Sequence, residues 1–79
     1  MKLYQLTNEK GEIFRCGAPV VVIDGNGTET LFSYGTEIMS RNADGKMTRN
    51  WDGWTQTTGK HIKAFCGLNK AGYMALKFN

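Results

Sequence analysis

Three glycine-containing turns divide the first fifty residues of this chain, and they restrict its fold more than any other feature. Two share the pattern Asn-x-x-Gly, at residues 8–11 and 42–45, and the third is Asp-Gly-Asn-Gly at residues 24–27. Asn suits the first position of a type I turn, and Gly suits the left-handed residue of the bulged hairpin loop that often contains it. The pattern therefore predicts short strands joined by hairpins.

The segments between these turns read as strands. The first hairpin is predicted to join residues 2–7 with 12–16, and the second to join 37–41 with 46–50. The segment at residues 20–24, which is continuously apolar up to Ile23, is typical of a central strand covered on both faces. The turn at 24–27 then leads into a strand at 28–33, and the alternation at 72–78 predicts a last strand.

One helix is predicted near residues 58–66. Thr57 or Thr58 can cap its start, and Gly67 can supply the left-handed residue that ends it. Ile62, Phe65 and Cys66 fall at helical spacing on one apolar stripe, whereas Lys60 and Lys63 lie toward the other side. So short a helix needs a sheet to dock on.

These elements predict one α+β domain over residues 1–79. Its core is an antiparallel β-sheet of five to seven short strands, with the short α-helix near residues 58–66 packed on it. A chain of 79 residues has a small core, which leaves little room for a deep catalytic pocket as well. Binding through an exposed face is therefore expected rather than elaborate chemistry.

Charge is distributed unevenly along the chain, whose net charge is +3. Residues 1–40 hold three basic and five acidic side chains, whereas residues 41–79 hold seven basic and two acidic ones. If the second half shares one face, that face attracts phosphate or an acidic protein surface; otherwise its lysines only aid solubility. No apolar run suits a membrane span or a signal peptide, so we expect a soluble, cytoplasmic protein.

The two cysteines and the single histidine give no enzyme or metal signature. On a helix, the five steps from His61 to Cys66 place them about 140° apart, so they do not face each other. No C-x-x-C or H-x-E unit is present, and neither a metal nor another cofactor is expected. Cys16 and Cys66 are expected to be reduced, buried thiols, because a cytosolic compartment disfavours a disulfide.

The start of the predicted helix is the first candidate binding site. Thr57, Thr58 and the first backbone N–H groups form a partly positive helix end, with Lys60, His61 and Lys63 nearby. This chemistry suits a phosphate or a carboxylate. The simpler interpretation is that a threonine caps the helix and that His61 lies at the surface or is a hydrogen-bonded core residue.

The second candidate is formed by Trp51 and Trp54, which flank a turn dipeptide that can bring their rings together. Exposed rings beside Arg49, Arg41 or Lys46 would suit base stacking. In so short a chain a tryptophan more often supplies buried area, and it can also anchor a protein interface.

Two segments resemble small proteins of bacteriophages and mobile elements. The segments are Phe-Ser-Tyr-Gly-Thr-Glu-Ile at 32–38 and, with Trp51 before it and Phe65 after it, Trp-Thr-Gln-Thr-Thr-Gly-Lys-His-Ile at 54–62. Those proteins carry a similar Ser-Tyr-x-Thr-x-Ile strand and Thr-Thr-x-x-His helix start. The resemblance brings no catalytic residue, but it implies an accessory protein that binds and blocks a host macromolecule, for example a defence system such as CRISPR–Cas.

The leading hypothesis is therefore a non-enzymatic protein that inhibits or modulates a host protein or nucleoprotein complex. The alternative is a nucleic-acid-binding module that uses the basic second half with Trp51 or Trp54. A third hypothesis is a structural component that self-associates through a sheet edge. The candidate contact residues are Arg41, Arg49, Trp51, Trp54, Thr57, Thr58, Lys60, His61 and Lys63.

Overall fold

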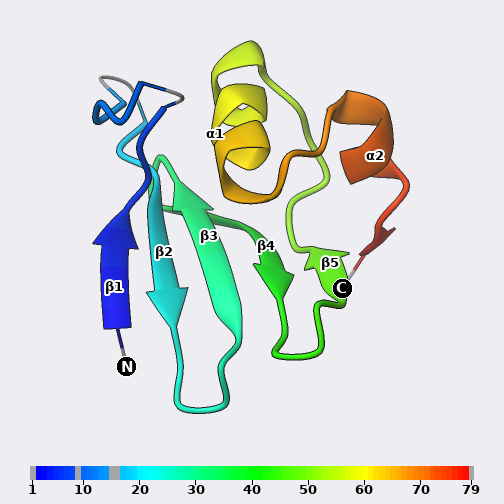
Figure 1. The fold of residues 1–79 in the computed structure, drawn as a ribbon. Coiled ribbons are helices and arrows are strands. Elements are labelled where there is room, and N and C mark those ends of the chain that lie inside the picture. The colour runs from blue at the N-terminus through cyan, green and yellow to red at the C-terminus, as the bar shows by residue number, and fades with distance from the viewer. Residues whose placement is uncertain (1, 9, 15–16, 79) are drawn as a thin grey trace.

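The computed structural model describes residues 2–8, 10–14 and 17–78. Figure 1 shows their strands and helices, which in chain order are β1 (Lys2–Gln5), β2 (Val20–Ile23), β3 (Glu29–Ser33), β4 (Thr36–Arg41), β5 (Met47–Arg49), α1 (Gln56–Cys66), α2 (Lys70–Met74) and β6 (Lys77–Phe78). One sheet carries the helices, so the α+β fold class is confirmed. Neither helix in these ranges is long and apolar enough to cross a bilayer.

The strands lie in the sheet in the same order as in the chain. The first five pair antiparallel with their neighbours, whereas β6 runs parallel to β5. A parallel pair requires a long crossover, and the chain makes one through α1 and α2 before it returns beside β5. The turns alone predict a purely antiparallel sheet. Because β5 and β6 are parallel, the sheet is mixed.

The predicted turns are confirmed, but one strand has a different neighbour. The second hairpin joins β4 to β5 as expected, and Asn42 N donates to Lys46 O over 2.9 Å. In the first, Thr7 and Ile13 form a bridge, and β1 pairs with β2 rather than with residues 12–14. Residues 15 and 16 lie outside the described ranges. The apolar β2 outcompetes the exposed 11–13 segment because it supplies the buried Val21.

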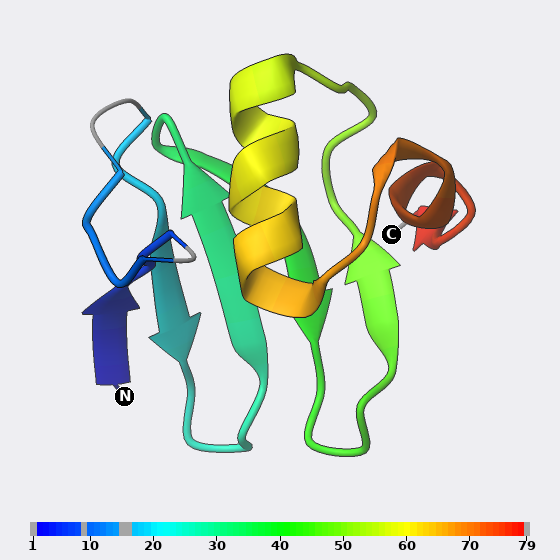
Figure 2. The same ribbon diagram turned by 45° about the horizontal axis from the view of Figure 1, so that its top comes forward.

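The sheet is covered on one face only. Figure 2 shows α1 lying across one face, with α2 on the side of the sheet where β5 and β6 pair, and within the described residues no helix covers the other face. In β2, Val21 is fully buried under α1, whereas Val20 and Val22 are half-buried on the uncovered side. The prediction that both faces of this strand are covered is therefore wrong.

The core lies between α1 and the sheet. Ile62 and Phe65 supply the apolar stripe of the helix, and α1 packs against β3. A β-bulge at Leu31/Phe32 shifts the register with β4, so the consecutive residues Ile38 and Met39 are both buried. The buried apolar residues are Leu6, Val21, Leu31, Ile38, Met39, Ile62, Phe65 and Tyr73.

The helix begins two residues earlier than predicted. Its N-cap is Thr55, whose backbone is extended and whose hydroxyl accepts a hydrogen bond from Thr58 N over 3.1 Å. Thr57 and Thr58 therefore lie inside the helix, and the prediction that one of them caps it is wrong. Gly67 ends the helix with φ 81°, as predicted, and its N–H donates to Lys63 O.

The predicted strand at residues 72–78 is mostly wrong. Asn69 caps α2 by accepting a hydrogen bond from Gly72 N over 2.8 Å, and only Lys77–Phe78 is extended. Tyr73 decides between the two structures, because in α2 its ring is fully buried and its hydroxyl reaches the carbonyls of Ile38 and Trp51. A strand could not bring this side chain into the core in the same way.

Candidate functional site

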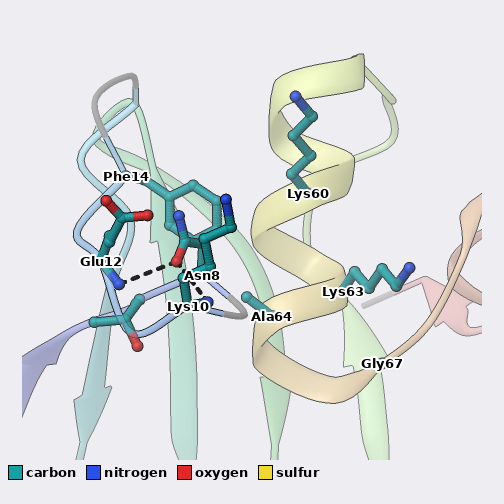
Figure 3. Close-up of a pocket in the computed structure, with 9 residues that line it drawn as sticks. Asn8, Lys10, Glu12, Phe14, Lys60, Lys63, Ala64 and Gly67 are labelled. Atoms are coloured by element: carbon teal, nitrogen blue, oxygen red, sulfur yellow. Dashed lines mark hydrogen bonds between the residues drawn. The ribbon is translucent and has the colours of Figure 1, made fainter.

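The described residues form a groove between the turn after β1 and helix α1. It has a volume of about 690 Å³ and is lined by Thr7, Asn8, Lys10, Glu12, Phe14, Lys60, Lys63, Ala64 and Gly67. Figure 3 shows the two walls facing each other, with the loop residues on one side and α1 on the other. We call this feature the groove. Its volume falls within the range of small-ligand and peptide-side-chain sites.

The loop wall is held by the side chain of Asn8. Its Oδ1 accepts hydrogen bonds from the backbone N–H groups of Lys10 and Glu12, over 2.9 and 3.0 Å. The backbone adds Asn8 N to Glu12 O at 2.8 Å and Gly11 N to Asn8 O at 2.9 Å. These bonds close a rigid Asx-type turn, which fixes the positions from which Lys10 and Glu12 project.

The helix wall follows from the spacing of four residues along α1. Lys60, Lys63, Ala64 and Gly67 stand at i, i+3, i+4 and i+7, so they form one stripe along the helix. The buried side of the helix is held by Ile62 and Phe65, so this stripe remains at the surface. In Figure 3 the ammonium of Lys63 is directed away from the loop, so its stem lines the groove and its charge lies at the rim.

A cluster of rings around His61 joins the two walls. The rings of Phe14 and His61 meet edge to face, with centroids 4.8 Å apart, and the Nδ1 atom of His61 is hydrogen-bonded to Ser33 Oγ at 2.7 Å. Gly17, at φ 81°, passes so close that a Cβ there would lie 2.5 Å from His61 Cε1. The loop is therefore fastened to the helix through His61.

The groove is positively charged. Within the described residues, no ion pair engages Lys10, Lys60 or Lys63, and Glu12 is the single acidic side chain among the lining residues. The predicted position of Lys60 and Lys63 away from the apolar stripe is confirmed, and both are exposed. Negatively charged groups are attracted to such a site.

The predicted arginines do not belong to the groove. Arg41 binds Glu29 through Nε at 3.1 Å and Nη2 at 2.9 Å, and its guanidinium lies 4.6 Å from the ring centroid of Phe65. Arg49 binds Asp52 at 2.7 Å and donates to Leu76 O at 3.0 Å. Each arginine therefore joins elements of the fold and is paired with a carboxylate of the chain itself.

The two tryptophans are half-buried and lie apart from the groove. The Trp54 ring packs over Gly59 and beside Tyr73, with ring centroids 5.8 Å apart, whereas the Trp51 ring packs on Gly53. No ring contact between Trp51 and Trp54 occurs within the described residues. The prediction that they are at least partly buried is confirmed.

The start of α1 borders a second, smaller cavity of about 120 Å³. Its lining includes Thr55, Thr58 and Trp51, together with Ser33, Tyr34, Thr36 and Ile38. Thr58 is buried and Thr57 is half-buried, so neither threonine is an open ligand at the helix end. The helix start and the groove are thus separate places on α1.

His61 is a buried core residue, as one of the two interpretations of the sequence predicts. Ser33 and His61 lie at the distance of a nucleophile and its base, but their exposed fractions are 1% and 0%, so a substrate has no access to them. Their hydrogen bond holds β3 against α1. The sequence does not reveal this pair, because the two residues lie 28 positions apart and share no local pattern.

Cys66 is a half-buried free thiol. Its Sγ lies 3.4 Å from Ile62 O and 3.8 Å from Met39 Sδ. Burial raises the pKa of this thiol above the ordinary 9.0, although a backbone hydrogen bond from Leu68 and the charge of Arg41 act the other way. Cys16, the other predicted thiol, lies outside the described residues. Within those ranges no three His, Cys, Asp or Glu side chains gather as metal ligands.

The sequence singles out two residues of the helix wall, as basic neighbours of the helix start, and none of the loop wall. Lys60 and Lys63 were recognised, whereas Asn8, Lys10, Glu12 and Phe14 were not. The Asn-x-x-Gly pattern at residues 8–11 predicts the turn itself correctly. It could not show that the loop lies beside α1, because that position depends on the pairing of β1 with β2.

Comparisons with known proteins give one match. A family model described as "Family of unknown function (DUF8033)" covers residues 1–77. No curated protein and no solved structure matches the chain significantly.

Proposed function

The chain belongs to the DUF8033 family, whose function is unknown, and on that premise we propose that it is a non-enzymatic protein that binds a host protein through the groove. The observation that carries the proposal is the charge of the groove. Lys10 and Lys60 stand on opposite walls of a 690 Å³ hollow, and no ion pair within the described residues neutralises them. Unneutralised like charges in one hollow favour an acidic partner.

The resemblance of residues 32–65 to phage and mobile-element proteins supports a partner from the host cell. Such small proteins often act by occupying a surface that a host macromolecule needs. We therefore propose inhibition or modulation of a host protein or nucleoprotein complex, for example a defence system, as the outcome of binding.

The second candidate, direct nucleic-acid binding, rests on the same lysines. It has less support, because Arg41 and Arg49 are engaged in ion pairs and the tryptophan rings pack on Gly53 and Gly59. Stacking and arginine forks are the usual means of holding single strands and phosphates.

A pull-down tests the proposal. The tagged protein is incubated with nuclease-treated host lysate, beside the double variant Lys10→Glu/Lys60→Glu and the control Lys46→Glu/Lys77→Glu. The control makes the same charge change on exposed residues outside the groove lining. We expect a stoichiometric protein that the wild type and the control retain and the groove variant loses.

Circular dichroism should show the same fold for all three proteins. Retention that depends on intact nucleic acid would support the second candidate instead. The absence of any stoichiometric partner, together with turnover of a small substrate, would falsify the proposal.

A further inference from the structure

The groove has the length of a short peptide segment. The stripe from Lys60 to Gly67 rises about 10 Å along α1 at 1.5 Å per residue. An extended chain covers that length with about three residues at roughly 3.3 Å each. A segment laid along the stripe would face the loop wall on its other side.

The chemistry of the walls defines what such a segment carries. Lys10 on the loop and Lys60 on the helix supply ammonium groups from both sides, and Lys63 adds a third at the rim. Between them, Phe14 and Ala64 provide apolar surface. Carboxylates that flank one apolar side chain complement this arrangement.

Glu12 and Phe14 favour a peptide over a nucleic acid as the occupant of the groove. Glu12 lines the groove beside Lys10, and its carboxylate repels nearby anionic groups, which a nucleic acid carries on every nucleotide and a peptide only on some side chains. A peptide backbone, by contrast, has N–H groups that can donate hydrogen bonds to the Glu12 carboxylate. The Phe14 ring is half-buried and meets the His61 ring edge to face, so it exposes less area to the groove than the open aromatic platforms on which bases stack. The part that lines the groove suits a single apolar side chain.

From these observations we infer that the groove binds a short, extended, acidic segment of its protein partner, with an apolar side chain seated on Phe14 and Ala64 between carboxylates. The inference rests on the proposed function and specifies its ligand. Lys10 and Lys60 bind the carboxylates, and the rigid Asn8 turn keeps the loop wall in place.

Fluorescence anisotropy with labelled pentapeptides tests the inference. The probes hold Leu, Met, Val or Phe at the centre, with Asp or Glu on both sides. The comparison probes are the Asn/Gln isosteres, an Ala-centred acidic peptide and a five-nucleotide oligothymidine. We expect at least one acidic peptide to bind at low salt, and to bind at least tenfold more tightly than its neutral isostere and than the oligonucleotide.

Variants of the protein locate the site. Each exposed ion pair contributes up to about fivefold in affinity, so Lys10→Gln/Lys60→Gln should weaken the best peptide severalfold, and by up to about 25-fold. Lys46→Gln/Lys77→Gln, outside the groove lining, should leave the affinity within twofold. In ¹⁵N-labelled protein, the peptide should shift the amide signals of Lys10, Ala64 and Gly67 most.

Three results would overturn the inference: equal binding of the neutral isosteres, tighter binding of the oligonucleotide, or no binding of any acidic peptide. If the pull-down partner still depends on Lys10 and Lys60 while the peptides fail, the groove binds a folded surface, and the proposed function survives. If both experiments fail, the proposed function fails too.

Discussion

Gly59 stands in the first half of α1, where alanine would ordinarily be the better helix residue by about 1 kcal/mol. A Cβ at this position would collide with Cζ2 of Trp54 and lie 3.0 Å from its Cε2. The Trp54 indole cannot easily move away from Gly59, because it also packs against the buried ring of Tyr73. Glycine is therefore required here for close packing rather than for backbone freedom.

We predict that Gly59→Ala destabilises the protein in spite of its higher helix propensity. Overpacking costs about 1–3 kcal/mol, so the net loss should be about 1 kcal/mol or more. Thermal unfolding should show it as a fall of several degrees in Tm.

Gly72→Ala in α2 is the matched control. There the nearest atom to the added Cβ is the end of the flexible Leu68 side chain, at 3.1 Å. The Gly72→Ala variant should be as stable as the wild type or more stable. An equal rise for both variants would contradict the role given to Trp54.

Tyr73 connects α2 to two other segments through its hydroxyl, at 2.6 Å from Trp51 O and 3.1 Å from Ile38 O. Removing the hydroxyl in Tyr73→Phe should cost about 1–2 kcal/mol at neutral pH, because the donor to buried carbonyls is lost. Urea unfolding followed by tryptophan fluorescence measures this loss. Tyr34→Phe, at an exposed tyrosine, should change little.

Burial also raises the pKa of Tyr73 above the ordinary 10.0. The folded protein thus holds the phenol proton more tightly than the unfolded chain does. The stability from this group is complete below pH 10 and is lost as the pH rises from there through the folded-state pKa. The difference in unfolding free energy between wild type and Tyr73→Phe should therefore shrink above pH 10, and a constant difference would contradict this account.

At the scale of elements, α1 depends on the N-cap Thr55, which lies before the segment that the sequence pattern predicts as helical. Thr55→Ala should cost about 1 kcal/mol, because it removes the acceptor for Thr58 N. Thr57→Ala, two residues after the cap and inside the helix, should lower the free energy of unfolding by less. Thermal unfolding monitored by circular dichroism compares the two, and the opposite order would place the cap at Thr57.

The elements that local chemistry determines were predictable. The turns at Asn42 and Asp24 and the end of α1 at Gly67 need only their own hydrogen bonds and dihedral angles, and the structure confirms all three. Residues 72–78 were predicted incorrectly because their alternation is local, whereas the burial of Tyr73 against Ile38 and Trp51 is not. Long-range contacts override the local pattern there.

At the scale of the whole molecule, the candidate site could be only half predicted. The helix stripe can be read from the spacing of Lys60, Lys63 and Gly67, but its opposite wall depends on where β1 finds its neighbour. The same limit applies to Arg41 and Arg49. Their ion-pair partners Glu29 and Asp52 appear only when the sheet order and the loop after β5 are known.

The order of the strands also governs how this chain reaches its fold. β2 to β5 pair across short connections at residues 24–28, 34–35 and 42–46, whereas β1 and β6 join across residues 6–19 and 50–76. Short connections close with the least loss of entropy, so the four-strand meander can assemble from neighbours in sequence. The two walls of the groove come from the two long connections. The groove is therefore completed by the slowest closures. Local opening of the connection at residues 6–19 would remove the loop wall and abolish the proposed binding, while α1 keeps its core contacts with the meander.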